Sequence, residues 1–145
     1  MKLVIQRVAK AALSVDEKLY SQIGKGYLVL VGIGKEDTKA KAEMLASKLQ
    51  KLRVMADADG KMNLSVSNAS GEMLVVSQFT LLADTQGGNR PSFIQAARPE
   101  TAHPLYDYFV EQLRKLGCEI KTGKFGADMQ ISCVLDGPVT ILIEN

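Results

Sequence analysis

The sequence predicts a single α/β domain over residues 1–145, with mostly antiparallel β-sheets and a layer of two main helices in a three-layer, barrel-like arrangement. Three observations favour this fold. Apolar β-branched runs recur along the chain, only two segments carry a helical period, and neither a linker nor an internal repeat divides the sequence. The 145 residues are 46% hydrophobic, which is enough for a substantial core and argues against disorder.

Short apolar runs bounded by turn residues predict four strands near the N-terminus. Asp16-Glu17-Lys18 forms the turn between the second and the third, and glycines precede the fourth. That fourth run is continuously apolar, which is typical of a strand buried on both faces. The four strands cover residues 3–8, 11–15, 19–23 and 27–31.

Arg7 interrupts the first of these strands. Under a period of two it shares a face with Leu3 and Ile5, and a buried guanidinium needs an acceptor such as a backbone carbonyl. The alternative turns the other face, with Val4 and Val8, toward the core and leaves Arg7 in solvent. The sequence alone favours this second arrangement.

Two amphipathic segments predict helices. Asp37-Thr38 is a suitable N-cap for the first, which we expect to run to about Arg53. Pro104 opens the second, which ends near Leu116 with Gly117 in the stop position. Lysines on the first helix either meet phosphates or form an ordinary solvated face, and the solvated face is the commoner case. The expected buried residues are Ala42, Leu45, Leu49 and Leu52 in the first helix, and Leu105, Phe109, Leu113 and Leu116 in the second.

Residues 74–82 lie mid-chain and begin as a buried strand, an apolar run without a helical period. The strand then ends in polar side chains at Ser77, Gln78 and Thr80, and a polar, glycine-rich loop over residues 83–93 follows. Hydroxyl and amide groups at a strand end beneath a loop are a common design for a site. The alternative is a strand that simply finishes in polar residues.

The last part of the chain is again β. Alternation over residues 129–135 and an apolar run over residues 139–143 predict two strands, with Gly137-Pro138 turning the chain between them. An ordinary hairpin turn is the default there, whereas a cis bond would present backbone carbonyls in an orientation that suits an amine. Earlier in the chain, residues 57–61 predict a turn rather than a calcium loop, because the closing glutamate is missing, and residues 63–66 a short strand.

The inventory of reactive side chains excludes several kinds of catalysis. His103 is the only histidine, so a two-histidine metal site within one chain is excluded, and the sequence has no zinc spacing, GxSxG elbow, phosphate loop or dinucleotide fingerprint. We therefore expect neither a metal nor a cofactor. Because Thr80 lacks an accompanying base, an enzyme here must use backbone amides, amide and hydroxyl side chains, or groups of its substrate.

The net charge, the cysteines and the length of the apolar runs bear on binding partners and on the cellular compartment. The net charge of +2 does not by itself mark a nucleic-acid binder. Cys118 and Cys133 form no CxxC pair and indicate free thiols in a reducing cytosol. No apolar run reaches the roughly 18 residues that a membrane span needs, so we expect no membrane association.

Several short motifs follow one another along nearly the whole chain. They are Ile5-Gln6-Arg7-Val8, Asp59-Gly60-Lys61-Met62-Asn63, Ser77-Gln78-Phe79-Thr80-Leu81, Asn89-Arg90-Pro91-Ser92-Phe93, Leu105-Tyr106-Asp107-Tyr108-Phe109-Val110, Thr122-Gly123-Lys124-Phe125-Gly126-Ala127-Asp128-Met129 and Asp136-Gly137-Pro138-Val139-Thr140. In this order they resemble the D-aminoacyl-tRNA deacylases of the bacterial and eukaryotic type.

The resemblance implies a cytoplasmic homodimer that hydrolyses the ester between a D-amino acid and the 3′-end of tRNA. It also implies cleavage of glycyl-tRNA mischarged on tRNA(Ala), and rejection of L-amino acids. In this family the Gly-Pro motif is cis and reaches into the pocket of the partner subunit. By that similarity the carbonyls of Gly137 and Pro138 would hold the α-amino group of the substrate, and Arg7 would orient the motif.

The same resemblance assigns the remaining site residues. The peptide N–H of Phe79 would donate to the oxyanion, and the 2′-hydroxyl of the terminal ribose would help to activate water. The residues concerned are Ser77, Gln78, Phe79 and Thr80 along the ester, Phe125 and Met129 around the terminal adenine, and Arg90 in the loop beside the pocket.

Two alternatives remain open at this point. Thr80 is a covalent nucleophile in one mechanism considered for the family, although the sequence supplies no base for it. A non-catalytic RNA-binding module with the same pocket is the competing function, because archaeal threonyl-tRNA synthetases carry an editing domain of similar fold.

Overall fold

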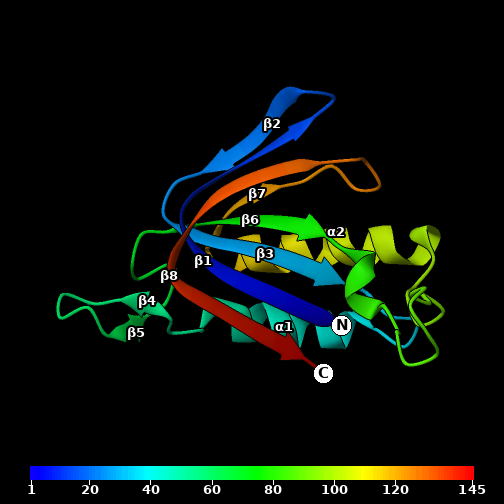
Figure 1. Cartoon of the computed structure of the whole chain (residues 1–145). Helices are drawn as coiled ribbons and strands as arrows, with labels where there is room; N and C mark the ends of the chain where they lie inside the picture. Colours follow the sequence, from blue (N-terminus) through cyan, green and yellow to red (C-terminus); the bar gives the residue numbers. More distant parts are fainter.

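The computed structural model describes residues 1–145, and six of its strands form a curled sheet with two helices on one side (Figure 1). The six-stranded sheet has the order β2-β1-β3-β6-β7, with β8 on the other edge of β1, and β4 and β5 form a separate hairpin. The elements are β1 (Lys2–Val15), β2 (Lys18–Ile23), β3 (Gly26–Gly32), α1 (Lys39–Gln50), β4 (Met55–Ala56), β5 (Met62–Leu64), β6 (Glu72–Ser77), the 3-10 helix η1 (Phe79–Leu82), α2 (Pro99–Lys115), β7 (Glu119–Thr122) and β8 (Gln130–Glu144).

β1 is one continuous strand, so the prediction of two separate strands over residues 3–8 and 11–15 is wrong. It stays unbroken because β8 pairs with it from Lys2 to Ser14, across the expected gap. On its other edge β1 pairs first with β3 and then with β2. Ser21 of β2 donates a hydrogen bond of 2.9 Å to the carbonyl of Thr122 in β7, which draws the two ends of the sheet together. The predicted barrel-like shape is confirmed.

The sheet is mixed, with antiparallel pairs in the majority. β1 pairs antiparallel with β2, β3 and β8, and β4 with β5, whereas β3–β6 and β6–β7 are parallel. The parallel connections run through α1 and α2. Because β3 and β6 are parallel, their carboxyl ends lie at the same edge of the sheet. That edge carries Ser77.

The predicted cap of α1 is confirmed, since the Thr38 hydroxyl accepts a hydrogen bond from the N–H of Lys41. The helix ends at Gln50, slightly before the expected Arg53. The predicted start of α2 is wrong: the helix begins at Pro99, and Pro104 lies inside it. Pro99 suits the first helical position, where no N–H is needed, whereas Pro104 only removes one internal bond. Neither helix is long and apolar enough to cross a membrane.

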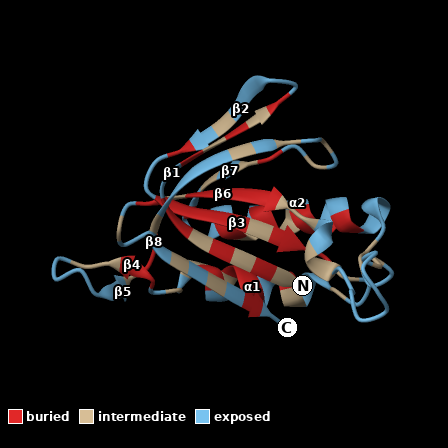
Figure 2. Ribbon diagram, in the orientation of Figure 1, coloured by how far each residue is buried: buried red, intermediate tan, exposed pale blue.

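Buried residues gather along β3 and β6 (Figure 2), and the core divides into two hydrophobic clusters. The larger joins the helices to residues such as Ile5 and Tyr27, while the smaller fills the inside of the curl with Leu28 and Leu74. β3 contributes to both, as predicted for a strand buried on both faces. The predicted buried stripe of α2 holds except at its last residue, because Leu116 is exposed.

β8 continues through Gly137-Pro138, so the expected hairpin turn there is wrong. Both halves of β8 pair with β1: Thr140 lies opposite Gln6, and Leu135 lies opposite Val8. Four residues, from Asp136 to Val139, therefore face only Arg7, and the excess makes a bulge rather than a turn. The Gly137-Pro138 peptide bond is cis.

The hairpin of β4 and β5 protrudes from the rest of the molecule (Figure 1). The predicted turn over residues 57–61 is confirmed, because the Asp57 carboxylate accepts the N–H groups of Asp59 and Lys61. The strand predicted over residues 63–66 starts and ends earlier, as Met62–Leu64.

Two buried tyrosines make the fold sensitive to alkaline pH. Burial raises the pKa of Tyr27 to about 12, and burial also raises the pKa of Tyr106 above its ordinary value. From about pH 10 upward the unfolded chain loses these protons while the folded chain keeps them. Stability therefore falls as the pH rises, by about 1.4 kcal/mol per pH unit for each tyrosine.

We expect Tyr27→Phe to reduce this loss, as measured by urea unfolding at a series of pH values between about 9 and 12. Tyr20→Phe is the matched control, because the Tyr20 side chain is half-exposed. An unchanged slope in a Tyr27→Phe/Tyr106→Phe double variant would contradict the assignment.

Candidate functional site

A cavity of about 530 Å³ opens at the carboxyl end of β6. It brings together five of the residues singled out from the sequence, namely Ser77, Gln78, Phe79, Phe125 and Met129. Asp128 is the one ionisable side chain among its lining residues. The other lining residues are Val31, Ile33, Val76, Ala97, Pro99, Ala102, Gly126, Ala127 and Ile131.

The turn from β6 into η1 fixes the polar end of the strand. The N–H of Gln78 donates to the carbonyl of Val31 at 2.8 Å, which ties the turn to β3. Gly32 lets η1 approach, since a Cβ atom there would lie 2.6 Å from Cδ2 of Leu82 and 2.9 Å from Cβ of Leu81. η1 therefore packs directly on β3, and its first residue, Phe79, faces the cavity.

Phe79 and Thr80 are both exposed. The Phe79 ring meets the Phe93 ring edge-on, with centroids 5.0 Å apart, and the Gln78 amide donates to the Thr80 hydroxyl. Thr80 itself does not line the cavity, and no acidic or basic side chain is hydrogen-bonded to it. As the first residue of η1, Phe79 has a peptide N–H without a carbonyl partner inside that helix.

The loop over residues 83–93 folds back on itself, as a bridge of two backbone hydrogen bonds of 2.8 Å joins Asp84 and Ser92. Phe93 at its end contacts Phe79, so the predicted loop beside the strand end is confirmed. Arg90 is exposed on this loop and does not line the cavity.

Phe125 and Met129 come from the segment between β7 and β8. The N–H of Gly123 donates to the carbonyl of Val75 at 2.9 Å, which anchors this segment to β6. The Phe125 ring stacks on His103, with centroids 4.3 Å apart and planes 9° from parallel. His103 is not among the site residues singled out from the sequence, because the stack depends on the position of α2, which local patterns do not reveal.

Arg7 is buried, so the prediction of a solvated arginine is wrong. Its Nη1 donates to the carbonyl of Val54 at 2.8 Å, and its Nε donates to the carbonyl of Asp136 at 3.1 Å. The Asp136 carboxylate lies 3.0 Å from the same Nε. The expected need for a carbonyl acceptor is met twice, and Leu3 and Ile5 share the buried face.

Gly137 and Pro138 are exposed and do not line the cavity of their own chain. Arg7 fixes the strand directly before them. A Cβ atom on Gly137 would lie 2.8 Å from Cγ2 of Val139 and 3.2 Å from Nη2 of Arg7, and Gly137 has φ +128°. Only glycine fits this position without displacing its neighbours.

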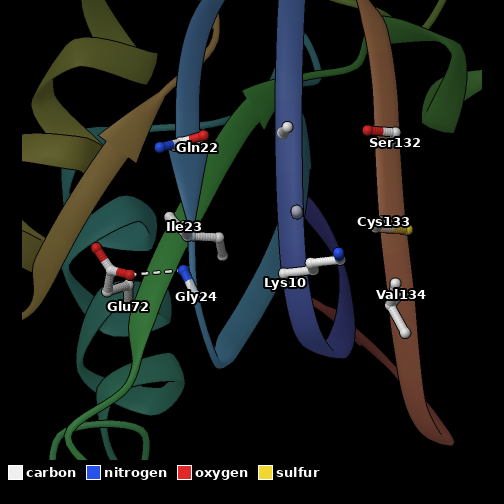
Figure 3. Close-up of a pocket in the computed structure, with 10 residues that line it drawn as sticks. Lys10, Gln22, Ile23, Gly24, Glu72, Ser132, Cys133 and Val134 are labelled. Carbon is white, nitrogen blue, oxygen red and sulfur yellow. Dashed lines mark hydrogen bonds between the residues drawn. The ribbon is translucent and has the colours of Figure 1, made fainter.

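A second hollow, of about 700 Å³, lies at the opposite end of β6 (Figure 3). Glu72, the first residue of β6, lines it and accepts a hydrogen bond of 2.7 Å from the N–H of Gly24. Lys10 and Cys133 also contribute to its wall. None of the predicted site residues does, so we place the functional site at the Ser77 end.

Comparisons with known proteins agree over the whole chain. The family described as D-Tyr-tRNA(Tyr) deacylase matches residues 4–144. A D-aminoacyl-tRNA deacylase from Porphyromonas gingivalis is 54% identical, and the alignment covers 100% of this chain and 97% of that protein. A D-aminoacyl-tRNA deacylase from Thermotoga petrophila is 52% identical with the same coverage, 100% and 97%.

Solved structures share the fold. A structure described as a c-Myc DNA unwinding element binding protein has a TM-score of 0.94 and 45% identity, and covers 100% of this chain and 99% of its own. A probable eukaryotic D-amino acid tRNA deacylase has a TM-score of 0.84 at 16% identity, covering 98% and 97%. With the family match and relatives above 50% identity, the chain belongs to the D-Tyr-tRNA(Tyr) deacylase family and is an ester hydrolase that acts on D-aminoacyl-tRNA.

Proposed function

We propose that this deacylase acts as a homodimer in the cytoplasm and proofreads aminoacyl-tRNA by chirality. It releases D-amino acids from tRNA and glycine from glycyl-tRNA mischarged on tRNA(Ala), and it spares L-aminoacyl esters. The observation that carries this proposal is the separation of two groups of residues within one chain. The cavity at Ser77 holds groups suited to an ester, whereas Gly137 and Pro138 stand exposed elsewhere.

Ester cleavage at this cavity relies on the backbone. Water attacks the ester carbonyl carbon, the bond to the ribose 3′-oxygen breaks, and a proton from the water ends on that oxygen. The N–H of Phe79 stabilises the oxyanion, and a single such donor is worth about 10²–10³ in rate. Ser77 and Gln78 position the ester, and the 2′-hydroxyl of the terminal ribose helps to activate the water.

The apolar part of the cavity suits the terminal adenine. Phe125 and Met129 line it, and single-stranded RNA bases commonly stack on aromatic side chains. Arg90, on the loop beside the cavity, binds the phosphates that precede the terminal adenosine in this proposal.

The backbone of Gly137 and Pro138 of the partner subunit forms a wall of the pocket that distinguishes D- from L-amino acids. The carbonyls of Gly137 and Pro138 accept hydrogen bonds from the substrate's α-amino group, and their placement leaves no room for an L side chain. The hydrogen bond from Arg7 to the carbonyl of Asp136 supports this role, because it fixes the strand immediately before the wall.

The unpaired edge of β8 supports the homodimer. β8 pairs with β1 alone, so its other edge is free, and the β8 side chains Val134, Leu135 and Leu142 are each more than 40% exposed. A long edge strand with exposed apolar side chains is normally covered by another chain. A second copy is the occupant that would bring Gly137 and Pro138 toward a cavity.

Thr80→Ala tests the backbone mechanism. We expect the variant to retain substantial hydrolysis of D-tyrosyl-tRNA, within roughly tenfold of the unmodified protein, because Thr80 has no base and the donor is the Phe79 N–H. The measurement is release of D-tyrosine under single-turnover conditions. Complete loss of activity in a folded variant, or an acyl group trapped on Thr80, would instead favour the covalent mechanism.

Substrate chirality gives a direct prediction for the unmodified protein. Glycine has no side chain to meet the wall, so glycyl-tRNA and D-tyrosyl-tRNA should be cleaved while L-tyrosyl-tRNA is spared. Apolar fit alone would discriminate by only about 10–200-fold. Efficient release of L-tyrosine would contradict exclusion by a wall, and binding without any hydrolysis would favour the non-catalytic module.

The dimer can be tested through its exposed strand. Leu142→Asp should give a monomer in analytical ultracentrifugation and reduce D-tyrosyl-tRNA hydrolysis at least about tenfold, because a buried, unpaired carboxylate opposes association. Met44→Asp on α1 is the matched control, since Met44 is similarly exposed, at 52% against 59%. A fully active monomer would show that the wall comes from the same chain.

A further inference from the structure

His103 lies against the wall of the functional cavity. It projects from the first turns of α2 and stacks almost flat on Phe125, with ring centroids 4.3 Å apart and 9° between the planes. The His103 side chain is 54% exposed, so its other surroundings are mostly solvent. Phe125 in turn lines the cavity. One ring thus separates His103 from the space that the substrate occupies.

Phe125 is partly buried against the larger hydrophobic cluster, and both of its aromatic contacts come from α2. It sits between Gly123 and Gly126, and Gly126 has φ +74°, so this short segment turns sharply around it. The N–H of Ala127 donates to the carbonyl of Lys124 at 3.2 Å and closes the turn. The two glycines supply no side chains to pack against, so the aromatic contacts that orient the ring are those of α2.

Two aromatic residues of α2 contact the Phe125 ring. His103 and Tyr106 are three positions apart and therefore lie on the same face of the helix. The Tyr106 ring is 5.9 Å from Phe125 at an angle of 52°, and the Tyr106 hydroxyl donates to the carbonyl of Val75 at 2.8 Å. Tyr106 is thereby fixed to β6, while His103 supplies the flat contact.

We infer that His103 is a positioning residue that sets the Phe125 ring for stacking with the terminal base of tRNA. This inference rests on the proposed role of Phe125 in binding that base. His103 orients Phe125 through ring stacking and not through an electrostatic interaction. Its ion-pair partner Asp107 lies 3.5 Å away and is 65% exposed, and such surface pairs contribute little.

A double-mutant cycle tests the inference. Steady-state hydrolysis of D-tyrosyl-tRNA is measured for His103→Ala, Phe125→Ala and the double variant. Aromatic pairs of this geometry correspond to about a two- to tenfold change in affinity, so His103→Ala should raise KM by that factor and leave kcat within about twofold. In the Phe125→Ala background the same substitution should have no further effect, because the ring it positions is absent.

Two further variants separate stacking from charge and from stability. His103→Phe keeps a flat ring and should restore KM to within about twofold of the unmodified protein. Asp107→Asn removes the ion pair alone and should leave KM unchanged. The melting temperatures of all variants are compared, since His103 is largely exposed and its substitution should not unfold the chain.

The outcomes distinguish this inference from the proposed role of Phe125. If Phe125→Ala raises KM but His103→Ala does not, the positioning role is wrong and base stacking stands. If Phe125→Ala leaves KM unchanged, both are wrong. An equal effect of His103→Ala in both backgrounds, or a fall in kcat together with the melting temperature, also overturns the positioning role.

Discussion

The pairing of β1 with β8 over almost their whole length is the constraint on which the rest of the structure depends. β1 carries β8 on one edge, and β3 and then β2 on the other, so three strands are attached to this one. At Arg7 the register slips, and four residues of β8 face this single residue. The excess chain bulges outward, which is why Gly137 and Pro138 are exposed in the middle of a paired strand.

Arg7 turns this bulge into a fixed feature. A buried guanidinium is costly unless its donors are paired, and here the carbonyls of Val54 and Asp136 and the Asp136 carboxylate satisfy it. The same side chain therefore links β1, the segment before β4, and β8. Removing it would leave three acceptors unpaired and free the strand that precedes Gly137.

Local sequence patterns correctly predicted those elements that depend only on residues close together in the sequence. The Thr38 cap, the Asp57 turn and the doubly buried β3 follow from short stretches of sequence. Two predictions are wrong because proline usually marks an end of a helix or strand. Pro104 indicates the start of α2, but the helix begins at Pro99. Gly137-Pro138 indicates a turn between two strands, but pairing with β1 on both sides keeps β8 continuous. Arg7 points toward the buried face of β1, where it meets its acceptors, Val54 and Asp136; both lie far from it in the sequence, and no local pattern indicates them. A cavity opens at the strand end where the sequence places Ser77 and Gln78. The residues that α2 contributes to it, Pro99 and Ala102, have no functional groups by which the sequence could have indicated them.

The proposed mechanism needs few ionisable groups, which agrees with a cavity that has one ionisable lining residue. An aminoacyl ester is already reactive, so in this proposal one backbone donor and a well-placed water provide a useful rate. Selectivity then requires a rigid obstacle more than a stronger catalyst. In the proposed dimer the obstacle stands on β8, where Arg7 fixes it, and the reacting groups stand on β6 and η1. The bulge is held by β1, and the turn from β6 into η1 is held by β3. A change in the bulge of one subunit would therefore alter the discrimination between D- and L-amino acids in its partner, while the end of β6 that binds the ester keeps its geometry.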